Sequence, residues 1–268
     1  MADDETEKKF IGATEPVPDI VWLPVTPGGK IIIAEKTFKI QPFYIAKYQI
    51  TNAQYEVFVK AADGFANLQW WFGMPEKYQR QELAEQRTIS KNNPRDNISW
   101  YQSVAFARWL NQKLWDGQFS ALGRRALVIG QNAQVRLPLE GEWQWAAQGG
   151  SQQKAYPWGE WREGYANTKE AGRGGTTTVG MYPQGAAECG AMDMSGNVWE
   201  WCLNKYSKPK ETQVDASGDN RVLRGGSCNN AQDVAACNYR YYDNPNYNVR
   251  NFGFRLVVSV PIEREEML

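Results

Sequence analysis

The stretch MDMSGNVWEW, residues 192–201, carries the most specific structural information in the chain. Its Gly-Asn pair at 196–197 is typical of a tight turn, and Asp193 and Glu200 stand seven residues apart around that turn. The two carboxylates can therefore converge on one point. The same residues also fit a simpler arrangement, in which Asn197 and Glu200 form hydrogen bonds to the loop itself.

The composition narrows the classes of function open to this chain. It has 268 residues, of which 42% are hydrophobic, and its 30 basic and 30 acidic residues give zero net charge. No basic stripe points to nucleic acid, and no apolar run approaches the roughly 18 residues of a membrane span. The start, MADDETEKKF, is polar and acidic, unlike a signal peptide. We therefore predict a cytoplasmic protein.

The sequence contains no histidine. This excludes Ser-His-Asp and Cys-His catalysis and any histidine-ligated zinc or iron. Four cysteines, at positions 189, 202, 228 and 237, form no C-x-x-C pair. In a cytosolic chain of this size we expect them to be free and mostly buried thiols.

The pattern along the chain predicts an α+β fold in one domain. Short antiparallel strands are expected over residues 20–49. A helix should begin after Thr51, with Gln54 completing a capping box, and a second helix should follow Ser99. Residues 135–150, VRLPLEGEWQWAAQGG, predict a short strand, a helix that starts after a proline, and a double-glycine stop. We expect a disordered lead-in at 1–15, the domain at 16–262 and a tail at 263–268.

Four segments then occur in a recognisable order. They are RLPLEGEWQWAAQGG (136–150), YPWGEWREGYAN (156–167), GAMDMSGNVWEW (190–201), and RVLRGGSCNNAQ (221–232) followed by NFGFRLV (251–257). Together they resemble the formylglycine-generating-enzyme, or sulfatase-modifying factor, family over nearly all of residues 20–260. The resemblance implies a C-type-lectin-like fold with two main helices, short antiparallel strands and much irregular structure.

The family resemblance does not fix the activity, because one fold can carry several functions. The family includes oxidases that convert a sulfatase cysteine to formylglycine, iron-dependent sulfoxide synthases, and non-catalytic binding proteins. In the oxidases two active-site cysteines lie three and eight residues after the serine of GGS. Counted from Ser227, those positions are Asn230 and Ala235 in this chain.

The remaining thiols do not restore the pattern. Cys228 and Cys237 are nine residues apart rather than five, and copper(I) needs two thiolates that converge on one ion. The sulfoxide synthases hold iron with histidine, which this sequence lacks. We therefore expect no catalytic residues and no enzyme activity.

The segment CNNAQDVAACNYRYYDNPNYNVRN, residues 228–251, contains seven asparagines and four tyrosines among 24 residues. Variable proteins of diversity-generating retroelements, a group of the family's binding proteins, carry their diversified segment at this place. Substitution at the adenines of asparagine codons yields the residue types found here. We therefore predict a variable segment at 228–252 with a ligand-binding face made of Cys228, Ala231, Val234, Asn238, Tyr239, Tyr241, Tyr242, Asp243, Asn246, Tyr247, Val249, Asn251 and Phe252.

Other interpretations of the segment stay open. Asparagine and tyrosine are common in irregular loops, so the chain also fits a member with a fixed ligand or partner. A cysteine-dependent formylglycine-generating oxidase is a further alternative. A third is a sensor or interaction module, because such domains are fused to signalling domains in bacteria. The expected partner is a protein or surface ligand that the sequence does not identify.

The resemblance also implies a structural calcium ion in the opening stretch. The matching ligands are the side chains of Asp193 and Glu200 and the main-chain carbonyls of Gly196 and Val198. Carboxylates and carbonyls are the hard oxygen donors that calcium prefers. We therefore expect Ca²⁺ as a structural cofactor.

Overall fold

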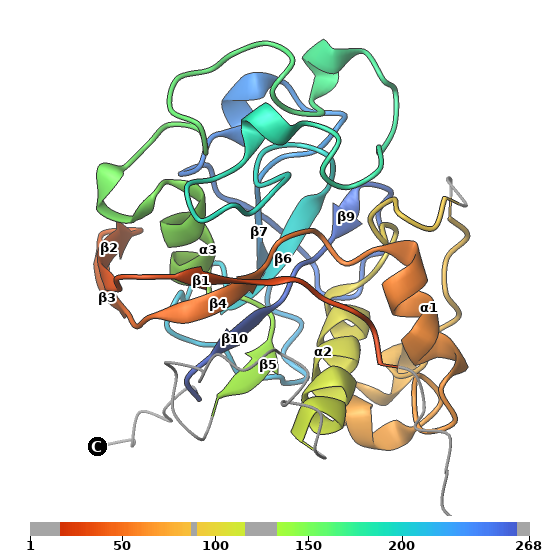
Figure 1. Cartoon of the computed structure of the whole chain (residues 1–268). Coiled ribbons are helices and arrows are strands. Elements are labelled where there is room, and N and C mark those ends of the chain that lie inside the picture. Colours follow the sequence, from red (N-terminus) through yellow and green to blue (C-terminus); the bar gives the residue numbers. More distant parts are fainter. Residues whose placement is uncertain (1–16, 87–89, 116–132, 262–268) are drawn as a thin grey trace, which may run out of the picture.

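The computed structural model describes residues 17–86, 90–115 and 133–261 (Figure 1). The predicted lead-in at 1–15 and tail at 263–268 lie outside the described residues. Among the residues that are described, no helix combines the length and apolar character that crossing a membrane requires.

The helices are α1 (Asn52–Lys60), α2 (Trp100–Trp115) and α3 (Glu140–Ala147). The strands are β1 (Trp22–Val25), β2 (Gly29–Ile33), β3 (Lys36–Ile40), β4 (Phe43–Ala46), β5 (Gln134–Arg136), β6 (Trp199–Lys205), β7 (Arg221–Arg224), β8 (Tyr241–Asp243), β9 (Phe252–Gly253) and β10 (Val257–Ser259). Short 3-10 turns connect them: η1 (Leu68–Trp71), η2 (Glu76–Tyr78), η4 (Gly150–Gln152), η5 (Lys169–Ala171), η6 (Pro183–Gly185) and η7 (Gln232–Ala235).

Two four-stranded sheets organise the described part of the chain. The first has the order β1-β4-β10-β5, and its neighbours are all antiparallel. β10 therefore lies between β4 and β5, two strands from much earlier in the sequence. The second has the order β8-β7-β6-β9, with β6 and β9 parallel. β2 and β3 form a separate hairpin. The predicted α+β class and the short antiparallel strands over 20–49 are thus confirmed.

Two helices begin at the predicted capping residues. Thr51 Oγ1 accepts a hydrogen bond from the Gln54 N–H at 3.3 Å, and Gln54 Oε1 accepts one from the Thr51 N–H at 2.9 Å. Ser99 and Gln102 form the same reciprocal pair before α2, at 3.1 and 3.0 Å. α3 ends at Ala147 with Gln148 as its C-cap, and the next residue, Gly149, has a φ of 72° in the left-handed region that glycine adopts without strain.

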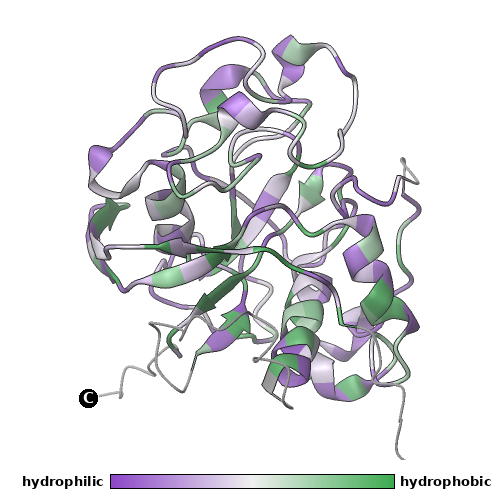
Figure 2. Ribbon diagram, viewed as in Figure 1, coloured by the Kyte–Doolittle hydropathy of each residue, from purple (hydrophilic) through white to green (hydrophobic). Residues whose placement is uncertain are grey.

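The core consists of two hydrophobic clusters. The first packs α1 and α2 against the strands through aromatic rings, with Tyr55 and Phe106 stacked at 5.3 Å and Phe106 edge-on to Phe254 at 5.6 Å between ring centroids. The second joins β2, β3 and α3 and includes Trp143 and Cys202. Figure 2 shows β10 in the green of hydrophobic residues, whereas α2 carries both hydrophobic and hydrophilic residues along its length.

A buried ion pair connects the two sheets. Arg255, two residues before β10, donates from Nε to Oε2 of Glu200 at 2.6 Å and from Nη2 to Oε1 at 2.7 Å, and both side chains are fully buried. The guanidinium also donates to the carbonyls of Ala46 at 3.2 Å and Met192 at 2.8 Å. Trp143 donates from Nε1 to the same carboxylate at 2.7 Å. One ion pair thus fixes β4, β6 and α3 relative to one another.

Removing this guanidinium should destabilise the fold strongly. Arg255→Met keeps most of the side-chain volume but leaves the Glu200 carboxylate buried without its charge partner, which costs about 3–5 kcal/mol. We expect urea unfolding to show this loss of unfolding free energy. Lys60→Met is the matched control, because Lys60 and Glu56 pair at 3.2 Å on the exposed side of α1, where a loss within about 1 kcal/mol is expected. Equal losses in the two variants would contradict the role assigned to the buried pair.

Candidate functional site

Residues 228–252 leave β7, pass through η7 and β8, and end at β9. β8 is an edge strand of the second sheet and pairs with β7, with Tyr241 opposite Leu223. Among the described residues, four of the nine exposed large hydrophobic side chains belong to this segment. They are Tyr239, Tyr241, Tyr242 and Tyr247, which are 37%, 38%, 43% and 52% exposed. This concentration makes the segment the candidate binding face.

Three of the four exposed tyrosines, Tyr239, Tyr241 and Tyr242, pack against other aromatic rings. Tyr241 stacks on Trp199 with centroids 5.0 Å apart, and Trp199 itself is only 3% exposed. Tyr242 lies 6.0 Å from Tyr241 and 4.3 Å from Tyr206. A partner that binds here would therefore meet rings whose positions are already limited by packing.

The main chain under the tyrosines is held by Arg224 of β7. This side chain is fully buried, and it donates to the carbonyls of Cys237 at 2.6 Å, Asn238 at 3.3 Å and Tyr239 at 2.8 Å. Gln144 of α3 holds the guanidinium in turn, because its Oε1 accepts from Nη2 at 2.6 Å. These contacts reach carbonyl oxygens, so they do not depend on which side chains the segment carries at 237–239.

Other fixed residues hold the segment in the same way. Ser195 Oγ donates to the carbonyl of Ala235 at 2.7 Å. The backbone N–H of Trp100 donates to the carbonyl of Pro245 at 3.1 Å. Near the end of the segment, the N–H of Trp199 donates to the carbonyl of Asn251 at 2.8 Å. The segment is therefore irregular in structure, but hydrogen bonds from other parts of the chain hold its main chain in place.

The predicted face residues divide by burial. Ala231, Asn238, Tyr239, Tyr241, Tyr242 and Tyr247 are exposed, and Val234, Asp243, Asn246, Val249 and Asn251 are half-buried. Cys228 and Phe252 need correction, because they are 5% and 3% exposed and cannot form part of a surface. Phe252 packs edge-on against Trp201 with centroids 5.3 Å apart. The two end positions of the predicted list therefore belong to the frame.

Arg240 and Glu140, which were not predicted from the sequence, support the candidate binding face. Arg240 donates from Nε and Nη2 to Glu140 at 2.6 and 2.9 Å. Its guanidinium also lies over the Tyr206 ring, 4.5 Å from the centroid. The sequence NYRYY, with Arg240 between two tyrosines, could have indicated a role for this arginine. Its acidic partner Glu140, however, lies 100 positions away in the sequence.

The thiols of this chain are mostly buried. Cys202, Cys228 and Cys237 are all buried, and Cys202 and Cys237 both lie in the second hydrophobic cluster. Burial raises the pKa of the Cys237 thiol to about 12, so the nucleophilic thiolate is scarce at neutral pH. The positions that match the oxidase cysteines hold a buried Ala235 and an Asn230 whose Oδ1 accepts from Ser227 Oγ at 2.6 Å.

The four residues predicted to bind calcium surround the side-chain amide of Gln49. Its nitrogen lies 3.2 Å from the Asp193 carbonyl, 3.5 Å from Gly196 O, 3.2 Å from Val198 O and 3.0 Å from Glu200 Oε1. Among the described residues no group of three or more cysteine, aspartate or glutamate side chains is arranged to hold a metal ion.

The Asp193 carboxylate has a different partner. Its Oδ2 accepts from the Gly180 N–H at 2.6 Å, and burial raises the pKa of this carboxyl to about 6. As they lie, the predicted ligands therefore do not fit a calcium ion. The calcium site stays a prediction, and a solution experiment on Gln49 tests it below.

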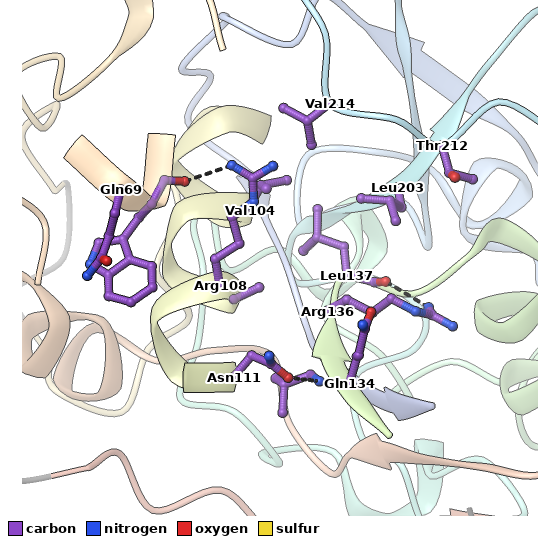
Figure 3. A pocket seen from close by; sticks show the side chains of 13 residues that line it. Gln69, Val104, Arg108, Asn111, Gln134, Arg136, Leu137, Leu203, Thr212 and Val214 are labelled. Atoms are coloured by element: carbon purple, nitrogen blue, oxygen red, sulfur yellow. Dashed lines mark hydrogen bonds between the residues drawn. The ribbon is translucent and has the colours of Figure 1, made fainter. Parts of the chain in front are cut away.

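A cavity of about 370 Å³ lies elsewhere, between α2, η1, β5 and the end of β6 (Figure 3). Its two arginines already have partners: Arg108 donates to the carbonyls of Trp70 and Phe72 at 3.0 and 2.7 Å, and Arg136 pairs with Glu142 at 2.7 Å. None of its lining residues comes from 228–252. The cavity is therefore not part of the candidate face.

Comparison with known proteins places this geometry in a family. The formylglycine-generating enzyme of Streptomyces coelicolor is 29% identical over 277 residues, which covers 82% of this chain and 79% of that enzyme. The hercynine oxygenase of Mycolicibacterium thermoresistibile is 27% identical and covers 77% of this chain and 48% of that protein. The solved structure of Treponema denticola variable protein 1 has a TM-score of 0.62 at 23% identity, covering 88% of this chain and 94% of that one.

At that identity the structural likeness shows the fold, which is the C-type-lectin-like α+β fold expected from the sequence. The sulfatase-modifying factor enzyme 1-like domain matches residues 12–260, nearly the whole chain. The chain therefore belongs to the sulfatase-modifying factor enzyme 1-like family.

Proposed function

We propose that this chain is a non-catalytic binding protein whose binding face consists of the exposed side chains within residues 228–252. The observation that carries the proposal is how the segment is held. Arg224, Ser195 and the Trp199 N–H hold its main-chain carbonyls, whereas the tyrosine side chains project from the surface. Tyrosine offers large, rigid contact area and asparagine offers adaptable hydrogen bonds, as in antibody binding sites. The partner would be a protein or a surface ligand.

We further propose that a retroelement diversifies this segment. Asn238, Tyr239, Tyr241, Tyr242 and Tyr247 are exposed, and each is a residue type that substitution at adenines of an asparagine codon can produce. Because the frame holds the backbone, these side chains can change without moving the segment. The likeness in fold to a Treponema denticola protein named a variable protein is compatible with this proposal.

The arrangement of the thiols argues against the alternative of a formylglycine-generating oxidase. A copper(I) site needs two thiolates at one point. Asn230 and Ala235 supply none, and Cys237 is 1% exposed within a hydrophobic cluster. The absence of histidine from the sequence also removes the usual general base at neutral pH.

The tyrosines should matter for binding and little for folding. Tyr247→Ala and Tyr239→Ala should each lower the unfolding free energy by no more than about 1 kcal/mol in urea titrations, because both rings are exposed. Phe252→Ala in the same segment is the matched control, and loss of its buried ring should cost about 3–5 kcal/mol. Equal losses in the tyrosine and phenylalanine variants would mean that the tyrosines belong to the core.

The same tyrosine variants define the binding measurement. The partner is first cross-linked to the wild-type protein in cells and purified. Replacing an anchor tyrosine by alanine should then weaken the binding of this partner by about 2 kcal/mol. Ile32→Ala is the control, because Ile32 is 69% exposed on β2, outside the segment. A partner whose affinity falls with Ile32→Ala but not with any tyrosine variant would contradict the proposed face.

Diversification predicts a pattern of sequence variation. Sequencing this coding region in many cells of one culture should show substitutions at the codons for exposed positions such as Asn238 and Tyr247, and an unchanged codon for Arg224. A near-copy of the segment should lie beside a reverse transcriptase gene. An invariant segment without such a copy would reject diversification and leave a fixed binding face.

The absence of oxidase activity is tested directly. The protein should leave a cysteine-containing sulfatase peptide unchanged in the presence of copper(I) and oxygen, because Asn230 and Ala235 stand at the positions that match the two oxidase cysteines. The formylglycine-generating enzyme of Streptomyces coelicolor is the positive control in the same assay. Loss of the peptide thiol with formation of an aldehyde would contradict the non-catalytic proposal.

A further inference from the structure

Gln49 lies two residues before Thr51, the N-cap of α1, and its side chain is fully buried. The amide nitrogen faces three carbonyl oxygens and one carboxylate oxygen at 3.0–3.5 Å, from Asp193, Gly196, Val198 and Glu200. An amide nitrogen carries two hydrogens, so four acceptors are more than it can fully satisfy. A ring of oxygens around one centre is the kind of environment that a cation would otherwise occupy.

The orientation of the Gln49 amide follows from the backbone of Thr177. The Thr177 N–H can only donate, and Asn197 Oδ1 accepts from it at 2.9 Å. The Thr177 carbonyl can only accept, and Asn197 Nδ2 donates to it at 3.2 Å. Asn197 Nδ2 therefore also faces Gln49 and donates to its Oε1 at 3.1 Å. Since the Gln49 oxygen points to Asn197, its nitrogen must point to the four oxygens.

This orientation and a calcium ion exclude each other. Calcium needs oxygen ligands at about 2.3–2.6 Å, whereas here the centre of the ring holds amide hydrogens with partial positive charge. The negative charge of the Glu200 carboxylate is balanced by Arg255, because both carboxylate oxygens accept hydrogen bonds from its guanidinium, at 2.6 and 2.7 Å. Gln49 thus supplies the donor hydrogens, and Arg255 supplies the positive charge.

The loop that Gln49 holds lies under both ends of the candidate face. The Cys228 N–H donates to the Asn197 carbonyl at 3.0 Å, and the Gly196 N–H donates to the Gly225 carbonyl at 2.7 Å. At the other end, β6 pairs with β9, with Trp199 opposite Phe252. The position of residues 193–200 therefore sets the position of the segment above them.

We propose that the amide nitrogen of Gln49 takes the place of a metal ion in this loop, so that the base of the candidate binding face keeps its shape without calcium. The proposal concerns the scaffold, and it holds or fails independently of what the face binds. It predicts that a carboxylate at position 49 would place an oxygen where the nitrogen now lies. Five oxygens would then surround one point, and a calcium ion would bind there.

The test compares melting temperatures in EGTA and in millimolar Ca²⁺. The wild-type protein should melt at the same temperature in both. Gln49→Glu should melt about 5 °C lower than the wild type in EGTA, because the new oxygen repels its neighbours, and Ca²⁺ should raise it again. Gln69→Glu is the matched control, since Gln69 is exposed, and it should behave like the wild type in both conditions.

Two further measurements keep the result decisive. Gln49→Met removes the amide without adding an oxygen, so it should be destabilised and should not respond to Ca²⁺. If Gln49→Glu does not fold in EGTA, circular dichroism should show it folding when Ca²⁺ is added. A wild-type protein that Ca²⁺ stabilises would overturn the proposal, and so would a Gln49→Glu protein whose folding does not respond to Ca²⁺.

Discussion

Glu200 and Arg255 share two hydrogen bonds in a fully buried site, where neither charge can be solvated by water. A buried charge without a partner is costly, so this pair fixes the relative positions of the elements that carry it. Arg255 also holds Ala46 at the end of β4, and Glu200 accepts from Trp143 of α3 and from Gln49 before α1. The two sheets, α3 and the turn at 193–200 meet at this one polar centre.

In the loops, where there is no regular secondary structure, polar side chains form hydrogen bonds with the buried backbone groups. Asn197 binds both backbone groups of Thr177, and its own carbonyl accepts from Cys228. Arg224 does the same for the carbonyls of residues 237–239. Buried backbone groups need partners, and in these loops the partners are side chains of the frame. As a result, the exposed side chains of 228–252 contribute little to holding their own main chain in place.

Local signals made part of this structure predictable. Thr51 with Gln54 announces a helix start because a capping box involves residues only three apart. The double glycine after α3 predicts the end of that helix from residues that are likewise close together in the sequence. The many asparagines and tyrosines of residues 228–251 also predicted an exposed binding face, and the four tyrosines of this segment are exposed. The ends of that segment were misjudged at Cys228 and Phe252, because burial depends on what the rest of the chain places above a residue. Phe252 meets Trp201, 51 positions earlier in the sequence.

The sequence by itself determined the family, the fold class, the helix starts and the loss of the oxidase cysteines, since each depends on residue types at short spacing. Only the tertiary structure decided which residues meet across the chain. Gln49 lies 144–151 positions before the oxygens it contacts, and Arg240 lies 100 positions from Glu140. Nothing in either local sequence requires these contacts. They form because β10 inserts beside β4 and because buried polar atoms must find partners within the packed core, wherever in the chain those partners lie.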